Sequence, residues 1–109
     1  MSVRAMYPDL MGKVIAITGG ASGIGAAIVS AFHEQGATVS FFDIAADAGA
    51  SLADRLGPGS RFHEVDLSDA EALGASFAEA ACVAGAFDVL VNNAAHDDRH
   101  EVLSVTPGY

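Results

Sequence analysis

A short apolar segment runs directly into a glycine-rich loop near the start of the chain, and this feature constrains the fold most. Residues 14–18 read Val-Ile-Ala-Ile-Thr, and Gly19, Gly23 and Gly25 follow. Glycine lets the backbone approach a ligand closely and adopt torsions that other residues avoid. A helix that begins in such a loop presents free N–H groups and its positive dipole end to an anion. The segment therefore predicts a strand, a turn and a helix that together bind a diphosphate, although a glycine triplet alone also fits a tight turn without a ligand.

Strand-like and helix-like segments alternate along the rest of the chain. The predicted strands span residues 13–18, 37–43, 61–65 and 87–91. Alternation with short turns is typical of right-handed βαβ units in a parallel sheet, and the glycine loop places the first strand at the switch point. We therefore predict an α/β fold in one domain, residues 1–109. Its doubly wound parallel sheet has the order 3-2-1-4 and is truncated after the fourth strand, with a polar loop from Asn92 onward.

Three helices are predicted between these strands. The first shows an apolar repeat typical of one buried helix face, formed by Ile24, Ala27, Ile28, Ala31 and Phe32, and it ends at Gly36. The second spans residues 47–56. The third begins at Ser68, where Glu71 completes a capping box, and ends at Gly85.

Composition excludes several classes of protein. Fourteen acidic residues against five basic ones give a net charge of −9, so no basic stripe is available for nucleic acid. No apolar run reaches membrane-spanning length, and residues 1–10 lack the apolar core of a signal peptide. Cys82 is the one cysteine, which excludes an intrachain disulfide, and we interpret it as a small buried residue of an alanine-rich helix. These features favour a cytoplasmic protein without membrane or nucleic-acid partners.

Asp43 closes the second predicted strand and indicates which dinucleotide is bound. A carboxylate at this position accepts both hydroxyls of an adenosine ribose and repels a 2′-phosphate. No Arg or Lys lies between Gly25 and Asp43 to bind such a phosphate. The pattern therefore favours NAD over NADP, the alternative being an acidic residue that simply lies at the mouth of a loop.

Two further polar pairs follow predicted strands. Asp66 and Leu67 follow the third strand, where they cover an adenine ring or, alternatively, help Ser68 to cap the next helix. Asn92 and Asn93 follow the fourth strand, where amide groups can tie neighbouring strands together and face the nicotinamide-side ribose. A polar turn is the weaker alternative for these asparagines.

These four segments, taken in order, resemble the short-chain dehydrogenase/reductase family. The matching pieces are Thr18–Gly25, Asp43, Asp66-Leu67 and Asn92-Asn93-Ala94-Ala95, with Ala95 where the family usually has Gly. The resemblance covers residues 12–109 and implies a Rossmann fold, a nicotinamide cofactor, a hydroxyl or carbonyl substrate, and a homodimer or homotetramer. We predict a cofactor site formed by Thr18, Gly19, Ser22, Gly23, Ile24, Gly25, Asp43, Ile44, Asp66, Leu67, Asn92, Asn93 and Ala94.

Residues 97–100, Asp-Asp-Arg-His, resemble the corresponding run in bacterial sugar 1-dehydrogenases of this family, such as D-xylose dehydrogenases. Two histidines four residues apart also raise the possibility of a metal site. That spacing brings both onto one face only in a helix, and this segment reads as a loop. We therefore predict no metal.

The family's proton donor is a Tyr followed four residues later by a Lys, and no such pair occurs here. Lys13 is the only lysine, and the tyrosines are Tyr7 and Tyr109. We therefore predict no catalytic residue, a chain that is the dinucleotide-binding part of a longer dehydrogenase, and no turnover in isolation. An unpaired fourth strand predicts self-association. A 3-oxoacyl-carrier-protein reductase-like parent and a non-catalytic nucleotide-binding module remain the alternatives.

Overall fold

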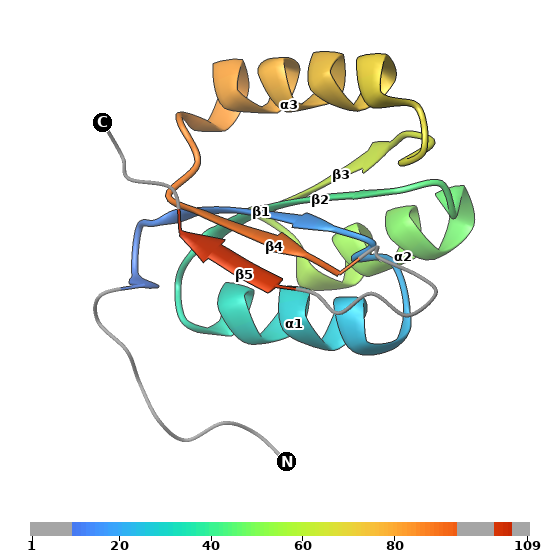
Figure 1. The fold of residues 1–109 in the computed structure, drawn as a ribbon. Coiled ribbons are helices and arrows are strands. Elements are labelled where there is room, and N and C mark those ends of the chain that lie inside the picture. Colours follow the sequence, from blue (N-terminus) through green and yellow to red (C-terminus); the bar gives the residue numbers. More distant parts are fainter. Residues whose placement is uncertain (1–9, 94–101, 106–109) are drawn as a thin grey trace.

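The computed structural model describes residues 10–93 and 102–105, which form one sheet with helices on both faces (Figure 1). Its elements in chain order are β1 (Val14–Thr18), α1 (Gly23–Glu34), β2 (Thr38–Asp43), α2 (Ala46–Leu56), β3 (Ser60–Glu64), α3 (Ala70–Ala84), β4 (Val89–Asn92) and β5 (Val102–Val105). Each predicted strand and helix is present, with ends shifted by one or two residues. The chain therefore follows the βαβ pattern that its sequence predicts.

The strands of the described residues are ordered β3-β2-β1-β4-β5. β1 pairs in parallel with both β2 and β4, and β2 pairs in parallel with β3. This arrangement confirms the doubly wound, Rossmann-type order 3-2-1-4, with β1 at the centre.

The expectation of a loop throughout the segment after Asn92 is wrong. Val102–Val105 forms β5, which pairs antiparallel with β4, so that β4 lies inside the sheet and is not its edge. The unpaired N–H and C=O groups of β4 favour any available strand, and the Val-Leu-Ser-Val sequence has the β-branched content of one. The prediction that β4 drives self-association as an exposed edge is therefore wrong.

Helices α1 and α2 cover one face of the sheet (Figure 1). Under them lies a core in which most side chains are completely excluded from solvent, formed by Ile15, Ile17, Val29, Ala37, Val39, Phe41, Leu52 and Val91. β1 and β2 contribute their alternate residues to this core because side chains of a strand point to opposite faces. Two helices are enough to bury this face.

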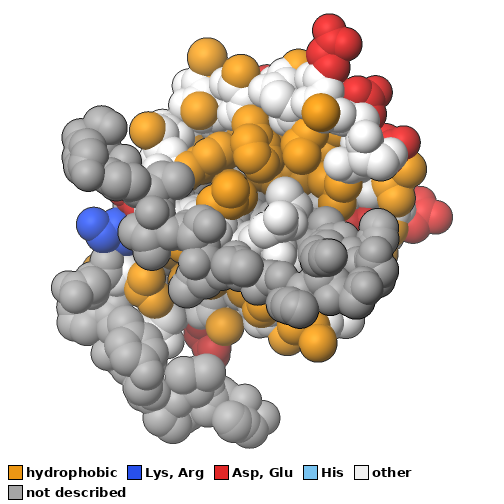
Figure 2. Space-filling model, viewed as in Figure 1, with side chains coloured by type: hydrophobic (Ala, Val, Ile, Leu, Met, Phe, Trp, Pro, Cys, Tyr) orange, Lys and Arg blue, Asp and Glu red, His pale blue; other side chains and the backbone are white. Residues whose placement is uncertain are grey.

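Helix α3 alone covers the other face. The core there is smaller and consists of Ala16, Phe42, Val65 and Ala80, with partly buried residues such as Phe77, Phe87 and Leu90 packed against it. Figure 2 shows hydrophobic side chains gathered on the surface below α3. This face is therefore less completely buried than the face under α1 and α2.

The buried face of α1 matches the predicted one only in part, because Ile28 and Phe32 pack against the core as expected but the other three residues do not. Ile24 is 73% exposed and Ala27 and Ala31 are also exposed, whereas Gly25 and Val29 are buried. The helix is rotated because Gly25 approaches the backbone of the glycine loop, where a side chain would not fit. Backbone packing at the start of the helix thus shifts the buried face relative to the apolar repeat, toward Gly25 and Val29.

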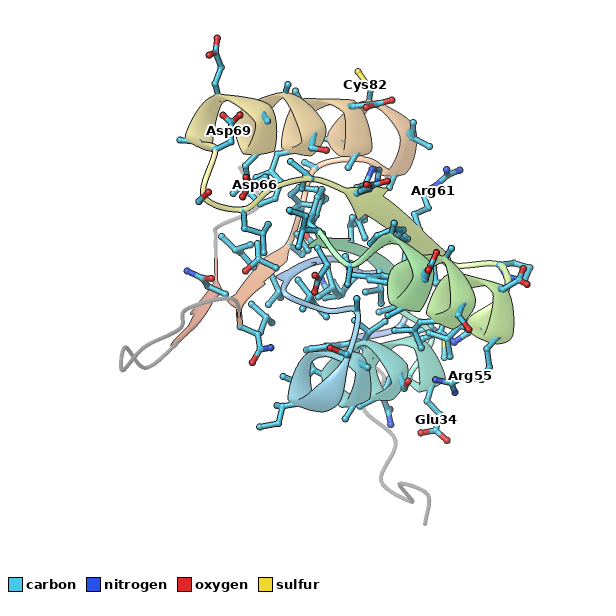
Figure 3. The ribbon with its side chains drawn as sticks, turned by 90° about the vertical axis from the view of Figure 1, so that its right-hand side faces the viewer. Glu34, Arg55, Arg61, Asp66, Asp69 and Cys82 are labelled. Atoms are coloured by element: carbon cyan, nitrogen blue, oxygen red, sulfur yellow. The ribbon has the colours of Figure 1, made fainter. Side chains whose placement is uncertain are left out.

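Two smaller predictions about α3 are also wrong. Its N-cap is Asp69, whose carboxylate accepts the Ala72 N–H at 3.0 Å, and the Ser68 hydroxyl instead donates to Asp66. Asp and Ser are about equally favourable N-caps, so residue type alone does not decide between Ser68 and Asp69. Cys82 is exposed, because it points away from the sheet (Figure 3).

Candidate functional site

The carboxyl ends of the parallel strands and the loop between β1 and α1 meet at one edge of the sheet (Figure 1). In the strand register, Thr18 lies opposite Phe42 on one side and Asn92 on the other. Asp43 follows Phe42 directly. The topology therefore brings the glycine loop, Asp43 and the paired asparagines together, as the sequence predicts.

The three glycines of the loop fulfil two different requirements. Gly19 and Gly23 have φ angles of 74° and 60°, in the left-handed region that favours glycine. At Gly25 a Cβ atom would overlap the carbonyl oxygen of Gly19, so this position requires space instead of a special torsion. The motif thus allows α1 to start in direct contact with the loop.

The first turn of α1 presents unpaired backbone N–H groups. The first helical bond is donated by the Ala26 N–H to the Ser22 carbonyl, so the N–H groups of Gly23, Ile24 and Gly25 have no partner within the helix. The Ser22 side chain makes no capping hydrogen bond, and residues 22–24 are exposed. This turn can therefore accept an anion without displacing an internal hydrogen bond.

Asp43 is half-buried and its carboxylate is held by two backbone groups. Oδ2 accepts the Ala21 N–H at 3.1 Å, and Oδ1 accepts the Ala45 N–H at 3.0 Å. Each carboxylate oxygen can accept about two hydrogen bonds. The side chain therefore keeps one acceptor position on each oxygen, which matches the two hydroxyls of a ribose.

The asparagines tie β4 to β1 as predicted. The Asn92 Oδ1 accepts the hydroxyl of Thr18 at 2.7 Å, and the Asn93 Nδ2 donates to the Gly19 carbonyl at 3.1 Å. The Asn93 N–H also donates to the Thr18 carbonyl at 3.1 Å. The strand-tying role is confirmed, whereas contact with a ribose stays a prediction. Ala94 lies outside the described residues.

Asp66 lies in the turn between β3 and α3 (Figure 3). Its Oδ1 accepts both the N–H of Ser68 at 3.0 Å and the hydroxyl of Ser68 at 2.7 Å. These bonds to the charged form, that from the hydroxyl above all, hold the pKa of the Asp66 carboxyl below its ordinary value of 3.8. Leu67 packs against the α3-side core, and Ile44 is 60% exposed beside Asp43. Leu67 remains a predicted contact for an adenine ring, and Ile44 remains a predicted cofactor-binding residue.

Sequence reasoning missed three positions, Gly20 and Ala21 in the loop and Ala45 at the start of α2. Gly20 is buried, and a Cβ atom there would lie 2.8 Å from Cβ of Phe41 and 2.9 Å from Val29. Ala21 and Ala45 contribute only N–H groups, which no residue type can reveal. The signal for Gly20 was available, because it is the second glycine of the Gly19-Gly20 pair.

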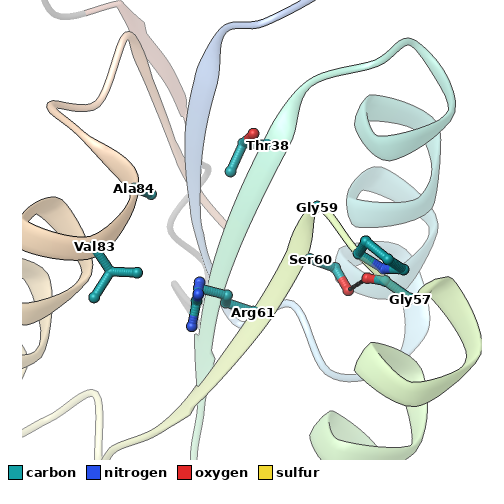
Figure 4. Close-up of a pocket in the computed structure, with 8 residues that line it drawn as sticks. Thr38, Gly57, Gly59, Ser60, Arg61, Val83 and Ala84 are labelled. Atoms are coloured by element: carbon teal, nitrogen blue, oxygen red, sulfur yellow. Dashed lines mark hydrogen bonds between the residues drawn. The ribbon is translucent and has the colours of Figure 1, made fainter.

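A cavity of about 660 Å³ lies at the opposite end of the parallel strands, beside the amino end of β3 (Figure 4). It is lined by Thr38, Gly57, Pro58, Gly59, Ser60, Arg61, Val83 and Ala84. None of the predicted site residues belongs to it. The cavity is therefore separate from the edge that carries the glycine loop.

In residues 10–93 and 102–105 no group of three or more His, Cys, Asp or Glu side chains is placed to hold a metal ion. The two histidines at 96 and 100 lie outside this range. No helix in the described residues is both long and apolar enough to cross a membrane.

The fold, together with the site at the carboxyl ends of the parallel strands, defines a doubly wound α/β domain with a glycine-rich first loop. The family model described as short chain dehydrogenase matches residues 13–107. The chain belongs to this family.

Two relatives match nearly the whole of this chain with less than half of their own length. "D-xylose 1-dehydrogenase" of Caulobacter vibrioides is 48% identical over 109 residues, and the match covers 96% of this chain and 42% of that protein. "Probable galactose dehydrogenase GalD" of Rhizobium meliloti is 44% identical over 106 residues, covering 94% of this chain and 41% of that protein. The chain therefore spans about two fifths of the length of these relatives.

A solved structure shows a related fold. It is a 3-ketoacyl-(acyl-carrier-protein) reductase from Brucella melitensis complexed with NADH. This structure matches with a TM-score of 0.72 and 30% identity, over 74% of this chain and 33% of that one.

Proposed function

We propose that this chain binds NAD at the edge formed by the glycine loop, Asp43 and the paired asparagines. The observation that carries the proposal is the combination of three unpaired N–H groups at Gly23, Ile24 and Gly25 with the Asp43 carboxylate on the neighbouring strand. The N–H groups would bind the diphosphate, and the carboxylate would accept the hydroxyls of the adenosine ribose. The NADH complex of the related reductase supports a nicotinamide cofactor.

The preference for NAD over NADP follows from charge. A 2′-phosphate would face the Asp43 carboxylate, and no Arg or Lys occurs between Gly25 and Asp43. The carboxylate is held in place by the N–H groups of Ala21 and Ala45, so it cannot swing away without breaking two hydrogen bonds. We therefore expect NAD to bind at least about tenfold more tightly than NADP, the effect of roughly 1.4 kcal/mol.

The chemistry proposed for the longer protein is hydride transfer between NAD and a hydroxyl or carbonyl group. The 48% and 44% identical relatives carry the names of dehydrogenases for D-xylose and galactose, which favours a sugar oxidised at a hydroxyl. NAD supplies the hydride acceptor, and the residues of this chain position it and exclude the 2′-phosphate. A cytoplasmic homodimer or homotetramer remains the proposed setting of the longer protein.

Calorimetry on the 109-residue chain tests the binding step. We expect heat of binding with NAD, weaker binding with NADP, and loss of about 10- to 100-fold in NAD affinity for Asp43→Ala, the range for a hydrogen bond to a charged group. Ile44→Ala serves as a milder control, because that side chain offers an adenine ring only apolar contact. No heat with either coenzyme from folded protein would refute the proposal.

Turnover tests the second step. The chain contains no Tyr-x-x-x-Lys, so we expect no NADH formation from NAD with D-xylose or D-galactose. A 3-oxoacyl-carrier-protein reductase is the second candidate for the longer protein, favoured by the related reductase structure. Sugar oxidation and acetoacetyl-thioester reduction by the longer protein would distinguish the two. If the longer protein binds NAD but performs neither reaction, a non-catalytic nucleotide-binding module is favoured.

A further inference from the structure

The Asp43 carboxylate is hydrogen-bonded to the backbone of the glycine loop. Its Oδ2 accepts the N–H of Ala21, which is only 5% exposed and lies in the middle of the loop. Its Oδ1 accepts the N–H of Ala45 at the start of α2. The carboxylate therefore helps to hold the loop in its conformation, in addition to its proposed contact with a ribose.

The end of β2 holds the loop at a second point. The N–H of Gly19 donates to the Phe42 carbonyl at 2.7 Å, and Gly20 is packed against Phe41. These contacts fix the backbone from residue 19 to residue 21. Ser22 and Gly23 follow at once and are exposed. The direction in which the first N–H groups of α1 point thus depends on the position of Ala21.

We propose that Asp43 is a positioning residue for the diphosphate-binding amides, in addition to its proposed contact with the ribose. The inference rests on the proposed function, because it concerns the same site. A charge-assisted bond from an N–H to a carboxylate is stronger than a neutral one, so its loss releases Ala21 from β2. Replacement of Asp43 then weakens the binding of a diphosphate even when the ligand has no ribose hydroxyls.

The alternative is that Asp43 acts on the ribose alone. The two roles separate with a pair of probes, ADP and 2′,3′-dideoxyadenosine 5′-diphosphate. The second compound keeps the adenine and the diphosphate and lacks both hydroxyls. A role in ribose binding alone predicts that Asp43→Ala weakens ADP binding and leaves the dideoxy compound unaffected.

The experiment combines calorimetry with amide NMR on the 109-residue chain. For Asp43→Ala we expect about a tenfold loss of affinity for the dideoxy compound, and a larger loss for ADP. The amide proton of Ala21 shifts upfield in the unliganded variant because its hydrogen bond is gone. Asp43→Asn keeps an oxygen that can accept one of the two N–H groups, so we expect its affinity for the dideoxy compound to be partly restored.

Asp88→Ala is the matched control. The Asp88 Oδ2 accepts the Val14 N–H at 2.9 Å, which is the same kind of bond at the opposite end of β1. Its removal lowers stability in a comparable way, but we expect the Ala21 amide and the affinity for the dideoxy compound to stay unchanged. This comparison separates positioning of the loop from a general loss of stability.

The outcomes also separate this inference from the proposed function. An unchanged Ala21 amide together with unchanged affinity of Asp43→Ala for the dideoxy compound overturns the positioning role, while NAD binding stands. Equal changes in Asp88→Ala overturn it as well. A third outcome is that the unmodified protein binds neither compound, while the Ala21 amide signal shifts only in the Asp43 variants. In that case Asp43 still positions the loop, but the proposed function is wrong.

Discussion

The two faces of the sheet are built from similar residues but are buried to different extents. Under α1 and α2, side chains such as Ile15, Ile17 and Phe41 are fully excluded from solvent. Under α3 fewer side chains are fully excluded, namely Ala16, Phe42 and Ala80, while Phe77, Phe87 and Leu90 are only partly buried. The difference teaches that one helix cannot cover a sheet face which two helices cover on the other side.

The same contrast appears in the polar groups. Two side-chain atoms of the described residues are buried without a hydrogen-bond partner, Ser40 Oγ and His63 Nε2. Both lie on the α3 side, because Ser40 alternates with Phe41 along β2 and His63 stacks on Phe42 at 4.8 Å. The two buried polar atoms without a partner among the described residues thus both lie on the less completely buried face.

Aromatic truncation gives the largest expected difference between the faces. Phe41→Ala removes a fully buried ring and should lower the free energy of unfolding by about 3–5 kcal/mol. Phe87→Ala removes a half-buried ring from the α3 side and should cost about half as much or less. Urea denaturation of both variants measures the two losses in the free energy of unfolding. Equal losses would contradict the comparison.

The glycines of α1 and α3 give the next largest effect. Gly25→Ala places a methyl group on the Gly19 carbonyl and should destabilise the chain by about 1–3 kcal/mol. Gly74→Ala is the matched change on α3, where nothing lies within 4 Å of the added Cβ. It should stabilise the helix by roughly 0.5–1 kcal/mol through the higher helix propensity of alanine. Thermal unfolding that moves both variants in the same direction would refute this account.

Ser40→Ala removes a buried hydroxyl that has no partner. Such a change should raise the free energy of unfolding by about 1 kcal/mol, since an unsatisfied polar group no longer has to be buried. Thr18→Val is the control of opposite sign, because the Thr18 hydroxyl donates to Asn92 at 2.7 Å. Denaturant titration of both variants measures the two signs. A loss of stability in Ser40→Ala would show that the hydroxyl is satisfied.

A pH effect at His63 is the smallest one expected. Burial lowers the pKa of His63 below 6.5, the carboxylate of Glu79 raises it and the guanidinium of Arg61 lowers it. The folded state therefore favours neutral His63, and the unfolded chain binds the proton more readily. The stability that depends on neutral His63 is fully present above about pH 6.5, the ordinary pKa of the residue. It is lost as the pH falls from there through the lower pKa of the folded state.

His63→Phe keeps the stacking on Phe42 and removes the titration. Unfolding curves measured between about pH 7.5 and 5 should show a flatter pH dependence for this variant. The carboxyl of Asp66 also has a lowered pKa, but it contributes to stability above its ordinary pKa and loses this contribution only at more acidic pH. If the free energy of unfolding changes with pH at the same slope in both proteins, His63 does not contribute to the pH dependence.

The sequence predicted the part of the site that depends on residue type. The order of the parallel strands, the position of Asp43 and the ties made by the two asparagines all follow from patterns that only a few residues can satisfy. Asp43 was predicted because the end of a strand beside a glycine loop has a fixed place in a doubly wound sheet.

The remainder depends on backbone contacts or on near-equal alternatives. The rotation of α1 is set by the contact of Gly25 with the loop, which the apolar repeat does not register. Strand β5 forms because β4 offers an open edge, and its four residues carry no strong period of their own. The N–H groups of Ala21 and Ala45 belong to the backbone, so no side chain announces them.

Titration of the ¹⁵N-labelled chain with NAD tests the central claim most directly. We predict that the amide signals of Gly23, Ile24, Gly25 and Ile44 shift on binding, while those of Gly59 and Arg61 beside the cavity at the opposite end of the parallel strands do not. Shifts confined to that opposite cavity, or no shift anywhere at millimolar NAD, would contradict it.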